Sequence, residues 1–151
     1  MNLRPMLVEP LLSACPSFRP RWDQHLTDWG GEDPGIYNDL TVFAEHLVES
    51  YAVSSTAEFP AVFQAVERLL SEGPEEARAA LSVGLLEDLQ VDGSHRPFGG
   101  NAFRPWLGAE SRRAWDEITK LWEGKRNLAG VIRAETKGQK RLPDSSSGGA
   151  V

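Results

Sequence analysis

Residues 74–90, Pro74-Glu-Glu-Ala-Arg-Ala-Ala-Leu-Ser-Val-Gly-Leu-Leu-Glu-Asp-Leu-Gln90, decide the fold. Pro74 followed by two acids suits the first turn of a helix, where the helix dipole favours negative charge. Apolar and small residues then occupy almost the whole circumference, which predicts a central helix covered on more than one side. Gly84 costs about 1 kcal/mol relative to Ala inside a helix. We therefore expect another helix to cross closely at Gly84.

Helical patterns continue on both sides of this segment. Apolar residues recur at helical spacing over residues 35–52, 56–73 and 109–123, and Gly124 is expected to end the last helix. Two stretches near the N-terminus, residues 5–14 with two prolines and residues 21–29 just after Pro20, are expected to be short helices. No stretch shows the alternation of a strand. The sequence predicts an all-α fold of five to six helices, arranged as antiparallel helical hairpins around one core.

A long loop, residues 91–105, is expected before the last main helix. Asp88 lies on the apolar face just ahead of it, and a buried carboxylate needs hydrogen bonds or a cation. We expect Asp88 to bind amides of the loop, or to pair with His95, Arg96 or Arg104. An alternative hypothesis makes Asp88, His95 and Arg104 the site of a small enzyme or ligand-binding domain. The expected aromatic anchors of the loop are Phe98, Phe103 and Trp106.

Charge divides the 151-residue chain unevenly. Residues 1–119 hold nine basic and 19 acidic side chains, a net charge of −10, whereas residues 120–151 carry +4. We therefore expect a single all-α domain over residues 1–124, then a basic segment and a flexible Ser/Gly-rich tail over 125–151. The overall charge of −6 argues against a general affinity for nucleic acid.

An acidic body has two interpretations. It can be a solvated surface that keeps the protein soluble, or a face that attracts a basic protein partner. For the second, we expect the acids of residues 35–52 to lie on the side of the helix that faces water. Trp29 is expected either to be buried or to belong to the same surface, where an aromatic side chain beside charges is typical of protein interfaces. The predicted partner-binding residues are Asp28, Trp29, Glu32, Asp33, Asp39, Glu45 and Glu49.

The usual catalytic and metal-binding patterns are missing from the sequence. Cys15 is the single cysteine, which excludes an internal disulfide and a cysteine zinc cluster, and we expect it to be a small buried apolar residue. His25, His46 and His95 lack the spacing of a helical metal pair. We expect no catalytic residue, metal or cofactor. Without a membrane span or a signal peptide, a cytoplasmic protein without a membrane partner is expected.

Two segments, Phe59–Gln90 and Leu107–Trp122, resemble a bacterial family of small all-α domains of unknown function. The resemblance covers roughly residues 35 to 123 and rests on packing residues, so it transfers no catalytic group. Proteins of this kind look like the small acidic immunity or antitoxin partners of secreted toxins. The resemblance and the charge division together suggest a non-enzymatic protein that neutralises a basic toxin, such as a nuclease, by direct binding.

Overall fold

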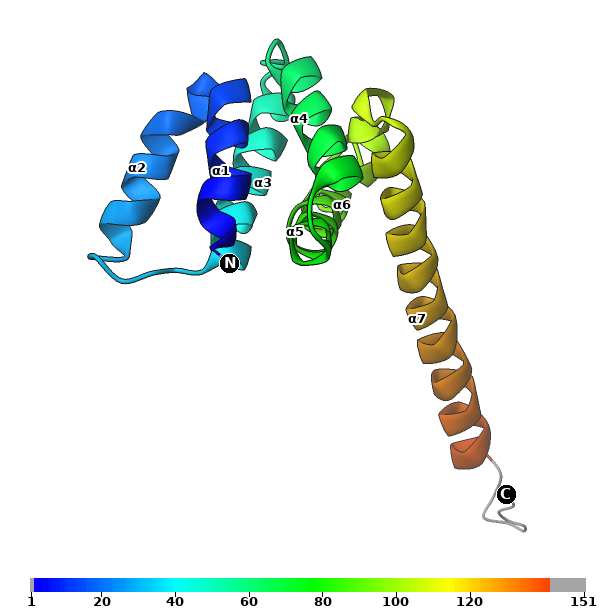
Figure 1. Ribbon diagram of the computed structural model, residues 1–151. Coiled ribbons are helices and arrows are strands. Elements are labelled where there is room, and N and C mark those ends of the chain that lie inside the picture. Colours follow the sequence, from blue (N-terminus) through cyan, green and yellow to red (C-terminus); the bar gives the residue numbers. More distant parts are fainter. Residues whose placement is uncertain (1, 142–151) are drawn as a thin grey trace. The chain divides into compact units, whose positions relative to one another are not determined.

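The computed structural model describes the backbone of residues 2–141 and the side chains up to residue 132. Over this range the chain forms seven α-helices, three shorter helical segments and no strand (Figure 1). The α-helices are α1 (Leu3–Ala14), α2 (Arg19–Asp28), α3 (Ile36–Ala52), α4 (Phe59–Glu72), α5 (Glu75–Ala80), α6 (Glu87–Ser94) and α7 (Ala109–Arg141). The shorter segments are the 3-10 turns η1 (Pro16–Phe18) and η3 (Gly100–Trp106) and the π-helical turn η2 (Leu81–Leu86). The predicted all-α class is confirmed.

The predicted number of helices, five to six, is too low. The two short segments near the N-terminus form full helices of 12 and 10 residues. In addition, the predicted central helix consists of α5 and α6 with the wider turn η2 between them. Among the described residues, no helix combines the length and the apolar character that a membrane crossing requires.

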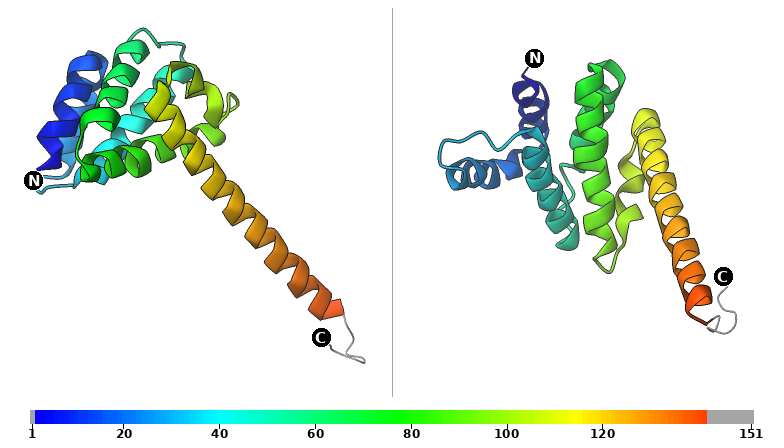
Figure 2. Two further views of the ribbon diagram at one scale, coloured as in Figure 1. Left: turned by 45° about the vertical axis from the view of Figure 1, so that its right-hand side comes forward. Right: turned by 90° about the horizontal axis from the view of Figure 1, so that it is seen from below.

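The chain divides into two compact units, Met1–Trp115 and Asp116–Val151. In the first unit, α3 contacts α1, α2, η2 and α6, whereas α4 contacts α1, α5 and η3 (Figure 2). Helices that are distant in the chain also pack together, because α1 lies beside α4 and α6 lies beside α3. The helix α1 takes this place by burying an apolar face of its own, made of Leu7, Val8, Leu11 and Leu12.

Gly84 lies in η2, where α3 packs against the central segment. A methyl group on Gly84 would approach the side chains of Leu40 and Tyr37 to 3.1 Å, which is closer than ordinary van der Waals contact. The expected close helix crossing is confirmed. The wider π-helical turn accompanies this contact.

The predicted long loop is mostly helical. The helix α6 extends to Ser94, and η3 follows after five residues. Two glycines allow the tight return, since a methyl group on Gly100 would lie 2.8 Å from the Gln90 carbonyl oxygen and one on Gly93 would lie 2.9 Å from the Gly100 Cα. The aromatic anchors are confirmed: the ring of Phe98 lies 4.5 Å from that of Tyr51, and Phe103 is completely buried.

Gly124 does not end the last helix, because α7 continues to Arg141 as one uninterrupted helix (Figure 2). A single glycine costs about 1 kcal/mol in a helix interior, and the helix-forming residues around it outweigh that cost. Of the predicted basic segment, residues 125–141 are helical. The predicted flexible tail, from Pro143, lies outside the described residues.

Candidate functional site

Four of the predicted partner-binding residues lie together at the end of α2 and in the connector to α3. Asp28, Trp29, Glu32 and Asp33 are all exposed to solvent. Leu26, one helical turn before Trp29, is exposed to the same extent, 37% for each of the two residues. Asp23, a further turn away, is also exposed. We call the six residues Asp23, Leu26, Asp28, Trp29, Glu32 and Asp33 the α2 surface.

Asp39 was expected to face water, and this expectation is wrong. Its side chain is fully buried, although it lies in the first turn of α3. The guanidinium of Arg4 donates two hydrogen bonds to the carboxylate, from Nε at 2.8 Å and from Nη2 at 3.1 Å. The ring Nε2 of His25 lies 2.8 Å from Asp39 Oδ1. Asp39 is therefore a structural residue, and its side chain is not available to a partner.

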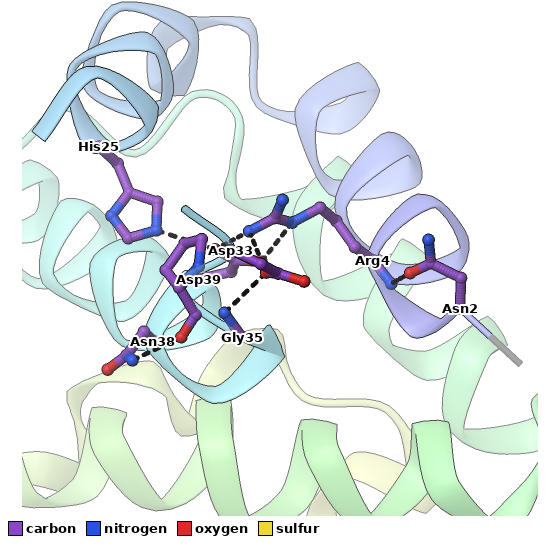
Figure 3. Close-up of polar contacts among 8 residues, drawn as sticks. Asn2, Arg4, His25, Asp33, Gly35, Asn38 and Asp39 are labelled. Carbon is purple, nitrogen blue, oxygen red and sulfur yellow. Dashed lines mark hydrogen bonds and ion pairs between the residues drawn. The ribbon is translucent and has the colours of Figure 1, made fainter. Parts of the chain in front are cut away.

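The buried carboxylate joins three helices, because Arg4 belongs to α1, His25 to α2 and Asp39 to α3. Figure 3 shows Arg4 and His25 approaching Asp39 from two sides. Arg4 also contacts Asp33, whose carboxylate lies 3.1 Å from Nη2. The hydrogen bond to Asp39, and the charges of Asp39 and Asp33, raise the pKa of Arg4 although partial burial opposes this shift. The network consequently fixes α2 and its connector to the rest of the first unit.

Local geometry shapes the connector between α2 and α3. Three of its glycines, Gly30, Gly31 and Gly35, have positive φ angles that other residues rarely adopt. Asp33 Oδ1 accepts a hydrogen bond from the Gly35 amide at 2.9 Å. The residue that caps α3 is Gly35, so the helix begins two residues later than a cap at Asp33 would place it. This geometry and the ion pair with Arg4 hold the acidic connector in place.

The two remaining predicted partner-binding residues, Glu45 and Glu49, line a pocket of about 250 Å³ between α3 and α6. His95, which belongs to the alternative hypothesis, and Arg96, a predicted partner of Asp88, line the same pocket, together with Val48 and Asp92. Glu49 forms an ion pair with Arg21 of α2. The hydrogen bond from Arg21 lowers the pKa of Glu49, and burial only partly opposes it. Residues from two separate hypotheses thus share one site.

Asp88 has a different partner from those predicted. It accepts a hydrogen bond from Thr41 Oγ1 at 2.8 Å, so the carboxylate joins α6 to α3. Burial, together with the charges of Asp92 and Glu87, raises the pKa of Asp88, while the bond from Thr41 opposes the rise. Neither Asp88 nor Arg104, which lies in η3, is among the residues that line the pocket with His95. The alternative site of Asp88, His95 and Arg104 is therefore not assembled there.

Sequence reasoning missed a polar cluster made by η1, α3 and the residue before α4. Ser17 Oγ donates a hydrogen bond of 2.6 Å to Glu58, and His46 Nε2 lies 2.9 Å from the same hydroxyl. The thiol of Cys15 also donates to Glu58, at 3.2 Å. Since the Ser17 proton points to Glu58, His46 donates to Ser17 and is not placed as its base. Residues 41 and 43 positions apart meet here, which no local motif indicates.

The expectation that Cys15 is a small buried residue is confirmed, because its exposed fraction is 2%. Burial raises the pKa of this thiol to about 12, and Glu58 adds to the rise. We therefore predict that a soluble disulfide reagent at pH 8 modifies Cys15 in the folded protein at least about 1000-fold more slowly than in urea. Absorbance of the released thiolate measures both rates. Rates within tenfold of each other would contradict the burial.

Among the described residues, no group of three or more histidine, cysteine, aspartate and glutamate side chains is arranged to hold a metal ion. The charged groups named above are instead used in ion pairs and hydrogen bonds or face solvent. What the geometry shows is an exposed apolar pair, Leu26 and Trp29, next to acidic side chains.

Comparison with known proteins identifies a family for most of the chain. A family model described as a domain of unknown function, DUF7674, matches residues 8–123. No curated protein and no solved structure matches the chain. The match includes both segments in which the resemblance was noted, but it does not connect the chain to immunity or antitoxin proteins. Since the matched region covers most of the sequence, the chain belongs to the DUF7674 family of domains of unknown function.

Proposed function

We propose that this protein is a non-enzymatic binding protein that holds a basic protein partner through the α2 surface. The observation that carries the proposal is the exposure of Leu26 and Trp29 next to acidic side chains. An apolar centre with an aromatic residue and a charged rim is the usual anatomy of a protein interface. A more specific version of this proposal is that the partner is a toxin and that the protein acts as its immunity protein or antitoxin.

The shape of the α2 surface is set before a partner binds. The contacts of Asp39 with Arg4 and His25 hold α2 against α1 and α3. The centre of the Trp29 ring lies 6.5 Å from that of the His25 ring, in an edge-on contact. A rigid surface loses little conformational entropy on binding, which favours tight association. This property suits a protein that must inhibit its partner by occupying it.

Electrostatics supports a basic partner in particular. Between Asp23 and Asp92 the sequence has 15 acids, with Arg68 and Arg78 as the basic residues. A field of one sign speeds association with a partner of opposite charge, and salt weakens the effect. We expect the complex to form quickly at low ionic strength and more slowly as salt is added.

The test uses the product of the neighbouring gene, because a toxin and its inhibitor are expected to be encoded together. Binding of the purified pair is measured by titration calorimetry. We expect Trp29→Ala to weaken binding at least about 30-fold, as removal of a central aromatic contact does. Asp28→Lys with Glu32→Lys should weaken it further and reduce its dependence on salt.

The matched control is the double variant Glu72→Lys with Glu76→Lys, which makes the same charge change at exposed positions of α4 and α5. We expect this variant to bind within about threefold of the original protein. Equal weakening by the control and by the α2 variants would contradict the assignment of the surface. A neighbouring protein that does not bind at low salt would contradict the immunity role.

A further inference from the structure

The second unit, residues 116–141 of α7 as described, carries a row of exposed aliphatic side chains. Leu121, Leu128, Val131 and Ile132 are each more than half exposed, with fractions of 54–61%. Scattered exposed apolar residues are normal, but a row of them along one helix marks an interaction surface. None of these residues belongs to the α2 surface, so the proposed partner site does not account for them.

Three residues of the row, Leu121, Leu128 and Ile132, have the spacing of a coiled coil. Positions 121, 125, 128, 132 and 135 alternate in steps of four and three residues, which is the a and d pattern of a heptad repeat. Lys125 occupies one position of this seam, and its ammonium lies 4.8 Å from the centre of the Trp122 ring. A charged residue in the seam restricts which partner and which orientation are acceptable.

Lys125 excludes one orientation and favours another. In a parallel pair in register, Lys125 would face Lys125 of the second helix, and like charges at a seam repel. In an antiparallel pair that places Leu128 opposite Ile132, position 135 comes opposite Lys125. The sequence has glutamate at position 135. In this register the central layers pair Leu128 with Ile132 and the next layers pair Lys125 with position 135, so these layers are complementary to a second copy in apolar character and in charge.

We propose that α7 pairs with α7 of a second copy of this chain as an antiparallel two-stranded coiled coil centred on Leu128 and Ile132. A two-fold axis relates the copies, so each contact occurs twice. The seam covers about two heptads, and such short coiled coils associate weakly. We expect a dissociation constant of about 10–100 µM, which makes the pairing sensitive to protein concentration.

The test measures the mass of the full-length chain by sedimentation over about 5–500 µM. We expect a shift from monomer to dimer with rising concentration. Leu128→Asn removes one apolar layer and introduces a polar side chain there, so it should weaken dimerisation at least about 20-fold. Arg126→Asn, outside the seam on the same helix, is the control and should leave the dissociation constant within about threefold. A chain that stays monomeric over the whole range would overturn the proposal.

A charge exchange tests the register itself. Lys125→Glu or Glu135→Lys alone places like charges opposite each other and should weaken dimerisation about tenfold. The double variant Lys125→Glu with Glu135→Lys restores opposite charges and should return to within about threefold of the original value. If the losses of dimer affinity in the two single variants add up in the double variant, the antiparallel register is wrong.

Trp29→Ala distinguishes the α7 pairing from another way in which two copies could associate. Binding of α7 to the acidic α2 surface of another copy would make dimerisation sensitive to Trp29→Ala, and this result would overturn the α7 pairing. A Trp29→Ala variant that still dimerises supports the α7 pairing. Because the measurement contains only this chain, failure of the coiled coil leaves the proposed binding of a basic partner intact, and the reverse also holds.

Discussion

Replacing Asp39 with alanine is expected to lower the free energy of unfolding by about 3–5 kcal/mol, the cost of removing one partner from a buried ion pair. The carboxylate is fully buried and accepts hydrogen bonds from Arg4 on α1, while His25 on α2 lies within hydrogen-bonding distance. Without it, the buried ring of His25 loses a partner and the guanidinium of Arg4 keeps the exposed Asp33 as its acidic partner. Urea unfolding followed by circular dichroism measures the loss.

Asp33→Ala is the matched control for this prediction. It removes an acid from the same guanidinium, but the side chain of Asp33 is 79% exposed, and exposed ion pairs contribute about 0–1 kcal/mol. Asp39→Asn, which keeps the shape and one oxygen, should fall between the two. If Asp39→Ala costs no more than Asp33→Ala, the network does not hold α2 in place, and the proposed rigidity of the α2 surface loses its basis.

Asp39 also shows why part of the fold could not be predicted. The helix 36–52 was predicted almost to the residue, because its apolar residues repeat within a few positions of each other. The burial of Asp39 comes instead from Arg4, 35 positions away, and from His25, 14 positions away. A helical wheel contains no information about such partners, so an acid beside the apolar stripe was assigned to solvent.

The α3–α6 pocket illustrates the same limit for the candidate site. Glu45 and Glu49 were predicted as partner-binding residues, and His95 and Arg96 as parts of a different site. Each residue type was recognised from the sequence, but their meeting depends on the return of α6 along α3. The long loop was misjudged for a related reason, since its glycines allow a compact helical turn as readily as an irregular one.

Glu67 makes a contact of comparable importance at the start of α7. From α4 its carboxylate accepts hydrogen bonds from the amides of Glu110 and Ser111, at 2.8 and 2.9 Å, and from the Ser111 hydroxyl at 2.8 Å. Gly108 permits the approach, because a methyl group there would lie 2.6 Å from the Glu67 Cδ. A residue 43 positions earlier thus caps the helix, a task that usually falls to a neighbour in sequence.

Glu67→Ala is therefore expected to lower the free energy of unfolding by about 2–4 kcal/mol, because two amides and a buried hydroxyl lose their acceptor. Glu72→Ala, at an exposed position of the same helix, should change it by less than about 0.5 kcal/mol. Urea unfolding of both variants measures the difference. Equal effects would show that the first turn of α7 does not depend on this carboxylate.

The same carboxylate predicts how stability changes with pH. Burial opposes ionisation of Glu67, but the hydrogen bonds from Glu110 and Ser111 outweigh it and lower the pKa below its ordinary value of 4.5. A group whose pKa is lower in the folded state contributes stability above its unfolded pKa and loses it as pH falls through the folded pKa. Glu49 and Glu58 also have lowered pKa values, so total stability should decrease below about pH 5.

The contribution of Glu67 is measured as the difference in the free energy of unfolding between the original protein and Glu67→Gln. This difference should shrink between about pH 6 and pH 3. A difference that stays constant over that range would show that the charge of Glu67 contributes nothing to the cap.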